Sequence, residues 1–92
     1  MSQIEKGCIV RSKSGRDSGR LFVVLETSSN EAVIVDGQLR CIEKPKRKNI
    51  KHLDFVSDGK MSRIYQKVKD GQRLENAEIK KTLNLFLTEE VL

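Results

Sequence analysis

The first half of the chain is built from short apolar segments separated by turn residues, and this spacing limits the possible folds more than any other feature. Five candidate strands lie within about 55 residues, with no helical pattern between them. They cover residues 7–12, 20–26, 32–35, 39–42 and 50–56. Short strands at this spacing predict a small five-stranded antiparallel barrel, because closure removes the exposed edges of a small open sheet.

Two segments carry more detailed predictions. The second candidate strand holds five consecutive apolar residues, 21–25, which predicts burial on both of its faces. Asp36-Gly37 follows the third candidate strand, and this dipeptide predicts a two-residue hairpin that pairs residues 39–42 back onto 32–35. The glycines of the loop 14–19 suit a left-handed backbone.

The second half changes to a helical period. Residues 62–69 give a weak helix signal, and Asn76 is a good N-cap for a final helix with one apolar stripe. The stripe consists of Ile79, Leu83, Phe86 and Leu87. We therefore expect a barrel over residues 1–58 and a C-terminal helical extension over residues 59–92 that packs on it.

The small size of the chain excludes many kinds of protein. Ninety-two residues suit one domain, or a small domain with a short appendage, and a doubly wound sheet around a catalytic cleft needs about twice that length. No nucleotide-binding, nucleophile-elbow or zinc-protease motif is present, and one histidine with two cysteines cannot complete a four-ligand zinc site alone. We expect a binding protein without catalytic residues, metal or cofactor.

Other features of the sequence predict the compartment. No apolar run approaches the roughly 20 residues of a membrane span, and residues 1–6 lack a signal peptide's apolar stretch. Cys8 and Cys41 are too few for a disulfide scaffold, and both are expected to be buried free thiols on strands. We expect a soluble cytoplasmic protein that does not contact membranes and is a monomer when free.

The positive charge is concentrated in one segment. Residues 40–52, RCIEKPKRKNIKH, hold six cations and one acid, so this segment carries the whole net charge of +5. A cluster of this kind fits a polyanion, since neutralising phosphates releases counterions. Two simpler alternatives remain, a solvated basic loop without a ligand and a nuclear localisation signal. Pro45 favours an extended start of the cluster.

A family resemblance rests on residues 5–55. Gly7-x-Ile9-Val10, then Ser14-Gly15-Arg16-Asp17-x-Gly19 and Phe22-Val23-Val24-Leu25 resemble a KOW motif. The continuation Val35-Asp36-Gly37-x-x-Arg40 and the basic segment from Lys44 to Leu53 resemble bacterial KOW-domain RNA-binding proteins. These are similar to the KOW-containing large-subunit ribosomal proteins of archaea and eukaryotes. The resemblance implies an SH3-like barrel that contacts structured RNA, usually ribosomal RNA of the large subunit.

Ten residues are the candidate RNA contacts. They are Arg16, Arg20, Arg40, Lys44, Lys46, Arg47, Lys48, Asn49, Lys51 and His52. Arginine suits bidentate phosphate contacts and lysine acts as a point charge. Only Tyr65 and Phe55 are left to stack on bases, so we expect recognition of shape and backbone with little sequence readout.

Simpler roles stay open for several of these residues. Arg16 and Arg40 are also compatible with ordinary surface charges, Asn49 with a turn and His52 with the capping of a strand end. Asp17 is expected to bond amides of its own loop. Since KOW domains also bind proteins, the alternative function is a protein-interaction module of the transcription or translation machinery.

Overall fold

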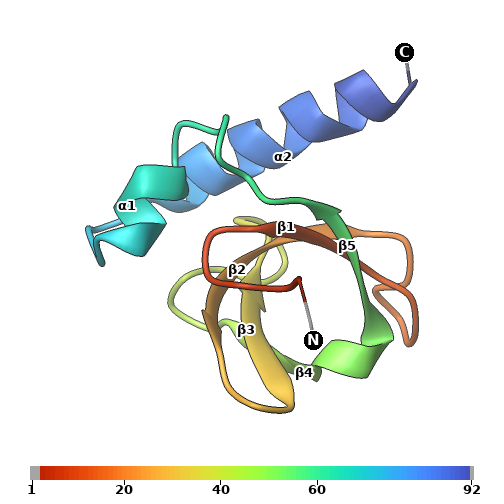
Figure 1. Cartoon of the computed structure of the whole chain (residues 1–92). Helices are drawn as coiled ribbons and strands as arrows, with labels where there is room; N and C mark the ends of the chain where they lie inside the picture. The colour runs from red at the N-terminus through yellow and green to blue at the C-terminus, as the bar shows by residue number, and fades with distance from the viewer. Residues whose placement is uncertain (1–2, 92) are drawn as a thin grey trace.

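The structure is a computed structural model that describes the backbone of residues 3–91 and the side chains of residues 3–87. Five strands form one antiparallel sheet in the order β4-β3-β2-β1-β5. They are β1 (Ile9–Ser12), β2 (Leu21–Thr27), β3 (Glu31–Val35), β4 (Lys46–Asn49) and β5 (Leu53–Ser57). The sheet curls into a small SH3-like barrel, seen end on in Figure 1. The predicted fold class is therefore confirmed.

Bulges and one tight turn close this barrel. The pairing register shifts between Ile9 and Val10 on β1 and between Val24 and Glu26 on β2. Bulges increase local twist and bend a strand, so they let a short sheet curve. A 3-10 turn, η1 (Ile50–His52), joins β4 directly to β5, the two outer strands of the sheet order.

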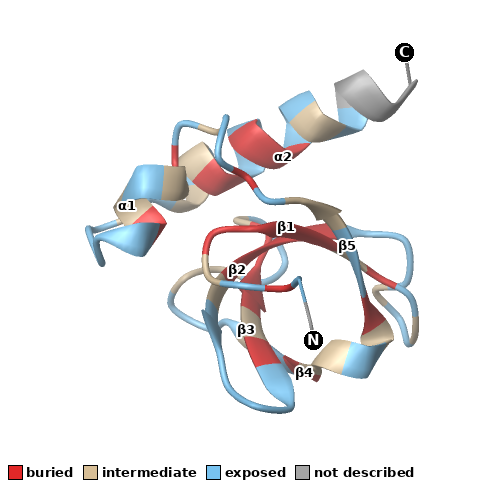
Figure 2. Cartoon of the chain, in the orientation of Figure 1, coloured by how far each residue is buried: buried red, intermediate tan, exposed pale blue. Residues whose placement is uncertain are grey.

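Two apolar clusters explain the unbroken apolar run of β2. Phe22 and Val24 belong to the cluster inside the barrel, whereas Leu21 and Val23 belong to a second cluster beneath the helices. Because successive strand residues point to opposite faces, a strand with both faces covered needs apolar residues throughout. Figure 2 shows the buried residues concentrated on β1, β2 and the helical surfaces that face them.

The helical part comprises α1 (Tyr65–Lys69) and α2 (Asn76–Val91), and both helices lie on one side of the barrel in Figure 1. Ile79 and Leu83 of the predicted stripe are buried against the sheet, Phe86 is half-buried and Leu87 is exposed. One apolar cluster thus joins strands and helices. The division of the chain at residues 58 and 59 stays a prediction.

The fourth strand differs from its prediction. Residues 39–42 lie in a loop, and β4 is instead Lys46–Asn49, which pairs with β3 through Ala32↔Lys48 and Val33↔Arg47. The predicted two-residue hairpin does not form. The backbone N–H groups of Asp36 and Gly37 instead donate to the Arg40 carbonyl, and the Asp36 side chain accepts from the N–H groups of Gln38 and Arg40. That local turn starts a ten-residue β3–β4 loop, 36–45.

Three smaller predictions also need correction. Residues 50–52 form η1 rather than the start of the fifth strand. Cys8 is buried beside β1, but Cys41 is half-buried in the β3–β4 loop, where its thiol donates to the Gln38 carbonyl. Asn76 starts α2, yet its side-chain oxygen accepts from the N–H of Ile42 and so ties the loop to the helix.

Candidate nucleic-acid interface

Strand alternation divides the basic segment in two. Along β4, Lys46 and Lys48 point to one side, whereas Arg47 is exposed on the other. Lys48 retains only 8% of its side-chain exposure, which is unusual for lysine without a partner. The shared direction of the two lysines could be predicted from the sequence, because residues two apart lie on the same face of an extended segment.

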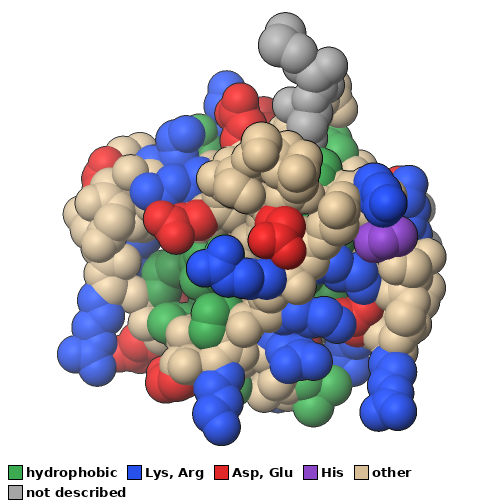
Figure 3. Space-filling model, turned by 90° about the horizontal axis from the view of Figure 1, so that it is seen from below, with side chains coloured by type: hydrophobic (Ala, Val, Ile, Leu, Met, Phe, Trp, Pro, Cys, Tyr) green, Lys and Arg blue, Asp and Glu red, His purple; other side chains and the backbone are tan. Residues whose placement is uncertain are grey.

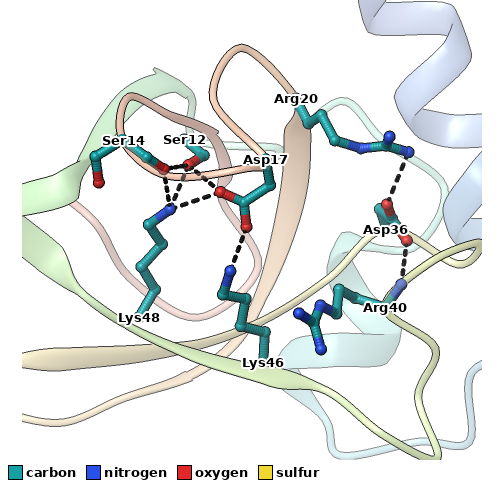
Figure 4. A network of polar contacts seen from close by, with 8 residues as sticks. All are labelled: Ser12, Ser14, Asp17, Arg20, Asp36, Arg40, Lys46 and Lys48. Carbon is teal, nitrogen blue, oxygen red and sulfur yellow. Dashed lines mark hydrogen bonds and ion pairs between the residues drawn. The ribbon is translucent and has the colours of Figure 1, made fainter.

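The partner of both lysines is Asp17 in the β1–β2 loop. Asp17 Oδ1 lies 2.7 Å from Lys48 Nζ, and Asp17 Oδ2 lies 2.6 Å from Lys46 Nζ. Ser12 Oγ donates to Asp17, and Lys48 Nζ also donates to Ser12 Oγ and to the Ser14 carbonyl. We call these five residues the Asp17 network (Figure 4). It joins the β1–β2 loop to β4.

The Asp17 carboxylate is strongly held in its ionised form. Burial opposes ionisation, but hydrogen bonds from Lys46, Lys48 and Ser12 outweigh it and hold the pKa of Asp17 well below its ordinary value of 3.8. The expectation that Asp17 bonds loop amides is therefore replaced by an ion-pair role. Lys48 uses its three N–H donors within the network, so it has none left for a phosphate.

The lowered pKa of Asp17 predicts a stability loss in acid. A carboxylate whose pKa is lower in the folded state contributes its full stabilisation above its unfolded-state pKa. This stabilisation declines as pH falls below that value and is lost as pH falls through the folded-state pKa. We expect the free energy of unfolding to decrease below about pH 4, measured by urea titrations over a pH series. Asp17→Asn should flatten this acid limb. Glu43 and Glu78 also have lowered pKa values, through hydrogen bonds from Asn76 and Lys67, so some slope should remain.

A second ion pair organises the neighbouring loop. Arg20 Nη2 lies 3.3 Å from Asp36 Oδ2, and the Asp36 side chain is only 6% exposed. The other oxygen of Asp36 accepts from the N–H groups of Gln38 and Arg40. Asp36 therefore holds the start of β2 and the β3–β4 loop together, and it places the Arg40 side chain on the same side as Lys46 (Figure 4).

Four of the ten candidate residues converge on one surface depression of about 240 Å³. Its cations are Arg16, Arg20, Arg40 and Lys46, which come from the β1–β2 loop, the β3–β4 loop and β4. We call this depression the cationic hollow. Its remaining lining residues are Asp17, Phe22, Asp36 and Leu39. Four cations and two acids leave it with a net positive charge, and Arg16 and Arg40 are exposed.

The other candidates are spread outside the cationic hollow. Lys44, Arg47 and Lys51 are exposed, whereas His52 is half-buried at the end of η1. Asn49 caps η1, since its side chain accepts from the Lys51 N–H, as its turn interpretation predicted. Figure 3 shows Lys and Arg side chains across one face of the molecule with Asp and Glu between them, so the charge there is not one continuous basic patch.

Aromatic side chains do not line the hollow as exposed platforms. Phe22 at its floor is fully buried, Phe55 on β5 is 39% exposed, and Tyr65 is half-buried beneath the Lys69 ammonium, 5.8 Å from its ring centroid. Base stacking needs an accessible ring face. The hollow therefore offers charge and shape rather than stacking.

Two kinds of feature are absent from the described residues. Among residues 3–87, whose side chains are described, His, Cys, Asp and Glu form no group of three that could hold a metal ion. Within the described part of the chain, no helix has the length and apolar composition needed to cross a bilayer.

No protein-family model matches the chain, and a search of curated proteins finds no significant match.

Proposed function

We propose that this protein binds structured RNA through the cationic hollow. The observation that carries the proposal is the convergence of Arg16, Arg20, Arg40 and Lys46 from three separate segments on one depression. Folding keeps these like charges together although they repel one another, and a bound phosphate would relieve that repulsion. The KOW resemblance of residues 5–55 supports the same ligand class.

The two acids of the hollow give the site its rigidity. Asp17 fixes Lys46 and Asp36 fixes Arg20, so these two cations hold their positions before RNA arrives. Side chains ordered in advance lose less conformational entropy on binding. Arg16 and Arg40 are exposed and supply guanidinium groups for bidentate phosphate contacts. Lys48 acts in this mechanism as a positioning residue for Asp17.

The finer parts of the proposal follow from the family resemblance. We propose ribosomal RNA of the large subunit as the ligand, a cytoplasmic location and a monomeric free protein without enzymatic activity. Recognition rests on the shape and phosphate backbone of the RNA, because the hollow lacks an exposed aromatic platform. The contact would extend outside the hollow through the remaining basic candidates, Lys44, Arg47, Lys51 and His52.

Replacing Arg16 and Arg40 together by Gln tests this site. We expect the affinity for a ribosomal RNA fragment to fall at least about tenfold, since a hydrogen bond to a charged group contributes about 1.5–3 kcal/mol. The slope of log affinity against log salt should decrease by about one for each lost phosphate contact. Filter binding over a salt series measures both quantities, and sedimentation with large ribosomal subunits tests the proposed partner.

The control is Arg73→Gln, which changes an exposed arginine that does not line the hollow. Equal losses for Arg73→Gln and the double variant would reject the hollow as the site and leave only nonspecific charge. The alternative function, a protein-interaction module, would be favoured by two results together. The protein would fail to sediment with large ribosomal subunits, and it would retain a stoichiometric protein partner after nuclease treatment.

A further inference from the structure

A second depression lies on the helical side of the molecule. It is a groove of about 640 Å³ between the β5–α1 connection and α2. Its apolar lining consists of Met61, Ile64, Leu85 and Phe86. We call it the apolar groove. It shares no lining residue with the cationic hollow, so the two sites can be altered separately.

The apolar groove has exposed apolar side chains at its edges. Met61 is 96% exposed and Leu85 is 57% exposed, while Phe86 is half-buried and packs against the core cluster beneath the helices. Scattered exposed apolar residues are common on protein surfaces. These residues instead line a single groove, and methionine adapts its shape readily to an apolar partner.

The uncompensated charge of this groove is positive. Arg63 and Lys81 line it and are exposed, and neither forms an ion pair with an acid among the described residues. Its one acid, Glu78, is bound by Lys67 and also accepts from the N–H of Glu75. A partner that fits the apolar lining and the two cations has an apolar face flanked by acidic residues.

The shape of the groove favours a helix as that partner. One wall is a face of α2 on which Glu78, Thr82 and Leu85 follow one another over two turns, a length of about 11 Å. An amphipathic helix laid along such a wall places apolar anchors at i, i+4 and i+7. The volume falls within the roughly 300–1,000 Å³ of ordinary binding sites.

We propose that the apolar groove binds an acidic amphipathic helix from a partner protein. The apolar anchors of that helix contact Met61, Leu85 and Phe86, and its carboxylates pair with Arg63 and Lys81. The apolar lining, rather than the charge, decides against RNA at this place, since Met61, Leu85 and Phe86 offer no hydrogen-bonding partner to a phosphate backbone. The protein then carries an RNA site on the barrel and a protein site on the helical side.

A displayed library of helical peptides with randomised positions tests the proposal, because selection from it requires no identified partner. Selection uses the nuclease-treated full chain, and the Lys81→Glu/Leu85→Ser double variant serves for counter-selection. We expect the enriched peptides to combine apolar anchors at helical spacing with flanking Asp or Glu. A synthetic enriched peptide, followed by fluorescence anisotropy, should bind at least about tenfold more weakly to Lys81→Glu and to Leu85→Ser.

Lys80→Glu is the matched control, because Lys80 is an exposed neighbour on α2 that does not line the groove. It should leave peptide affinity within about twofold, whereas equal losses for Lys80→Glu and Lys81→Glu would overturn the proposal. So would the absence of enrichment, or enrichment of basic or neutral peptides. Circular dichroism of each variant verifies that the fold is retained.

Two other occupants would also overturn the proposal. Phosphatidylglycerol vesicles that sediment with the wild-type protein but not with Leu85→Ser would assign the groove to an anionic lipid surface. A concentration-dependent dimer in sedimentation velocity that disappears in Leu85→Ser would assign it to a second copy of the chain. Neither result would affect the Arg16 and Arg40 experiment, so the RNA proposal is tested independently.

Discussion

Replacing Asp17 by Asn is expected to lower the free energy of unfolding by about 3 kcal/mol, because the change leaves the buried Lys48 ammonium without its counter-charge. The amide keeps the shape of the side chain but removes the charge that faces both lysines. Urea denaturation followed by circular dichroism measures the loss. For a domain of this size the melting temperature should fall by roughly 15 °C.

Asp54→Asn is the control for this experiment. Asp54 pairs with Lys13 at 3.4 Å, but the two side chains are 59% and 49% exposed, so the expected loss is below about 0.5 kcal/mol. Adding Lys48→Met to Asp17→Asn should recover part of the stability, since it removes the unpaired buried charge. Equal losses for Asp17→Asn and Asp54→Asn would show that the Asp17 network does not tie the β1–β2 loop to β4.

Gly37→Ala should have a similar effect for a different reason. Gly37 has a φ of +77°, and an added Cβ would lie 2.3 Å from the Asn76 carbonyl oxygen and 2.9 Å from the Lys80 nitrogen. These are backbone atoms of α2, so the β3–β4 loop and the helix must separate. We expect a loss of about 3 kcal/mol in urea denaturation, combining left-handed strain with lost packing.

The same substitution at Gly71 separates the two contributions. Gly71 has a φ of +69°, and an added Cβ there meets no atom within 4 Å. Gly71→Ala should therefore cost only about 1 kcal/mol, the strain of a left-handed alanine. If both variants lose the same stability, the close approach of Gly37 to α2 does not contribute to the fold.

Local patterns predicted the barrel and its first three strands well. Apolar segments bounded by turn residues identify β1, β2 and β3 within two residues, because a half-buried or buried strand needs such a run. The fourth strand was missed because its residues, KRKN, carry no apolar pattern. Its backbone pairs with β3, and its two inward lysines are neutralised by an acid 29 or 31 residues away in the chain.

The turn at Asp36-Gly37 also depends on residues that are distant in the chain. The dipeptide is compatible with a tight hairpin, but the Asp36 carboxylate also meets Arg20, and Gly37 lies against α2. These distant partners select a long loop. For the helices, the sequence predicted the apolar stripe of α2. It did not predict that Asn76 holds the β3–β4 loop through a hydrogen bond from the Ile42 N–H.

The strand-rich barrel, the apolar face of the last helix and the positive charge of residues 40–52 could all be predicted from the sequence alone. These are properties of local spacing and composition, which act before any distant contact forms. The sequence did not reveal which cations form internal ion pairs and which remain exposed. That choice depends on Asp17 and Asp36, because ion pairs form between side chains that folding brings within a few ångströms, whatever their separation along the chain.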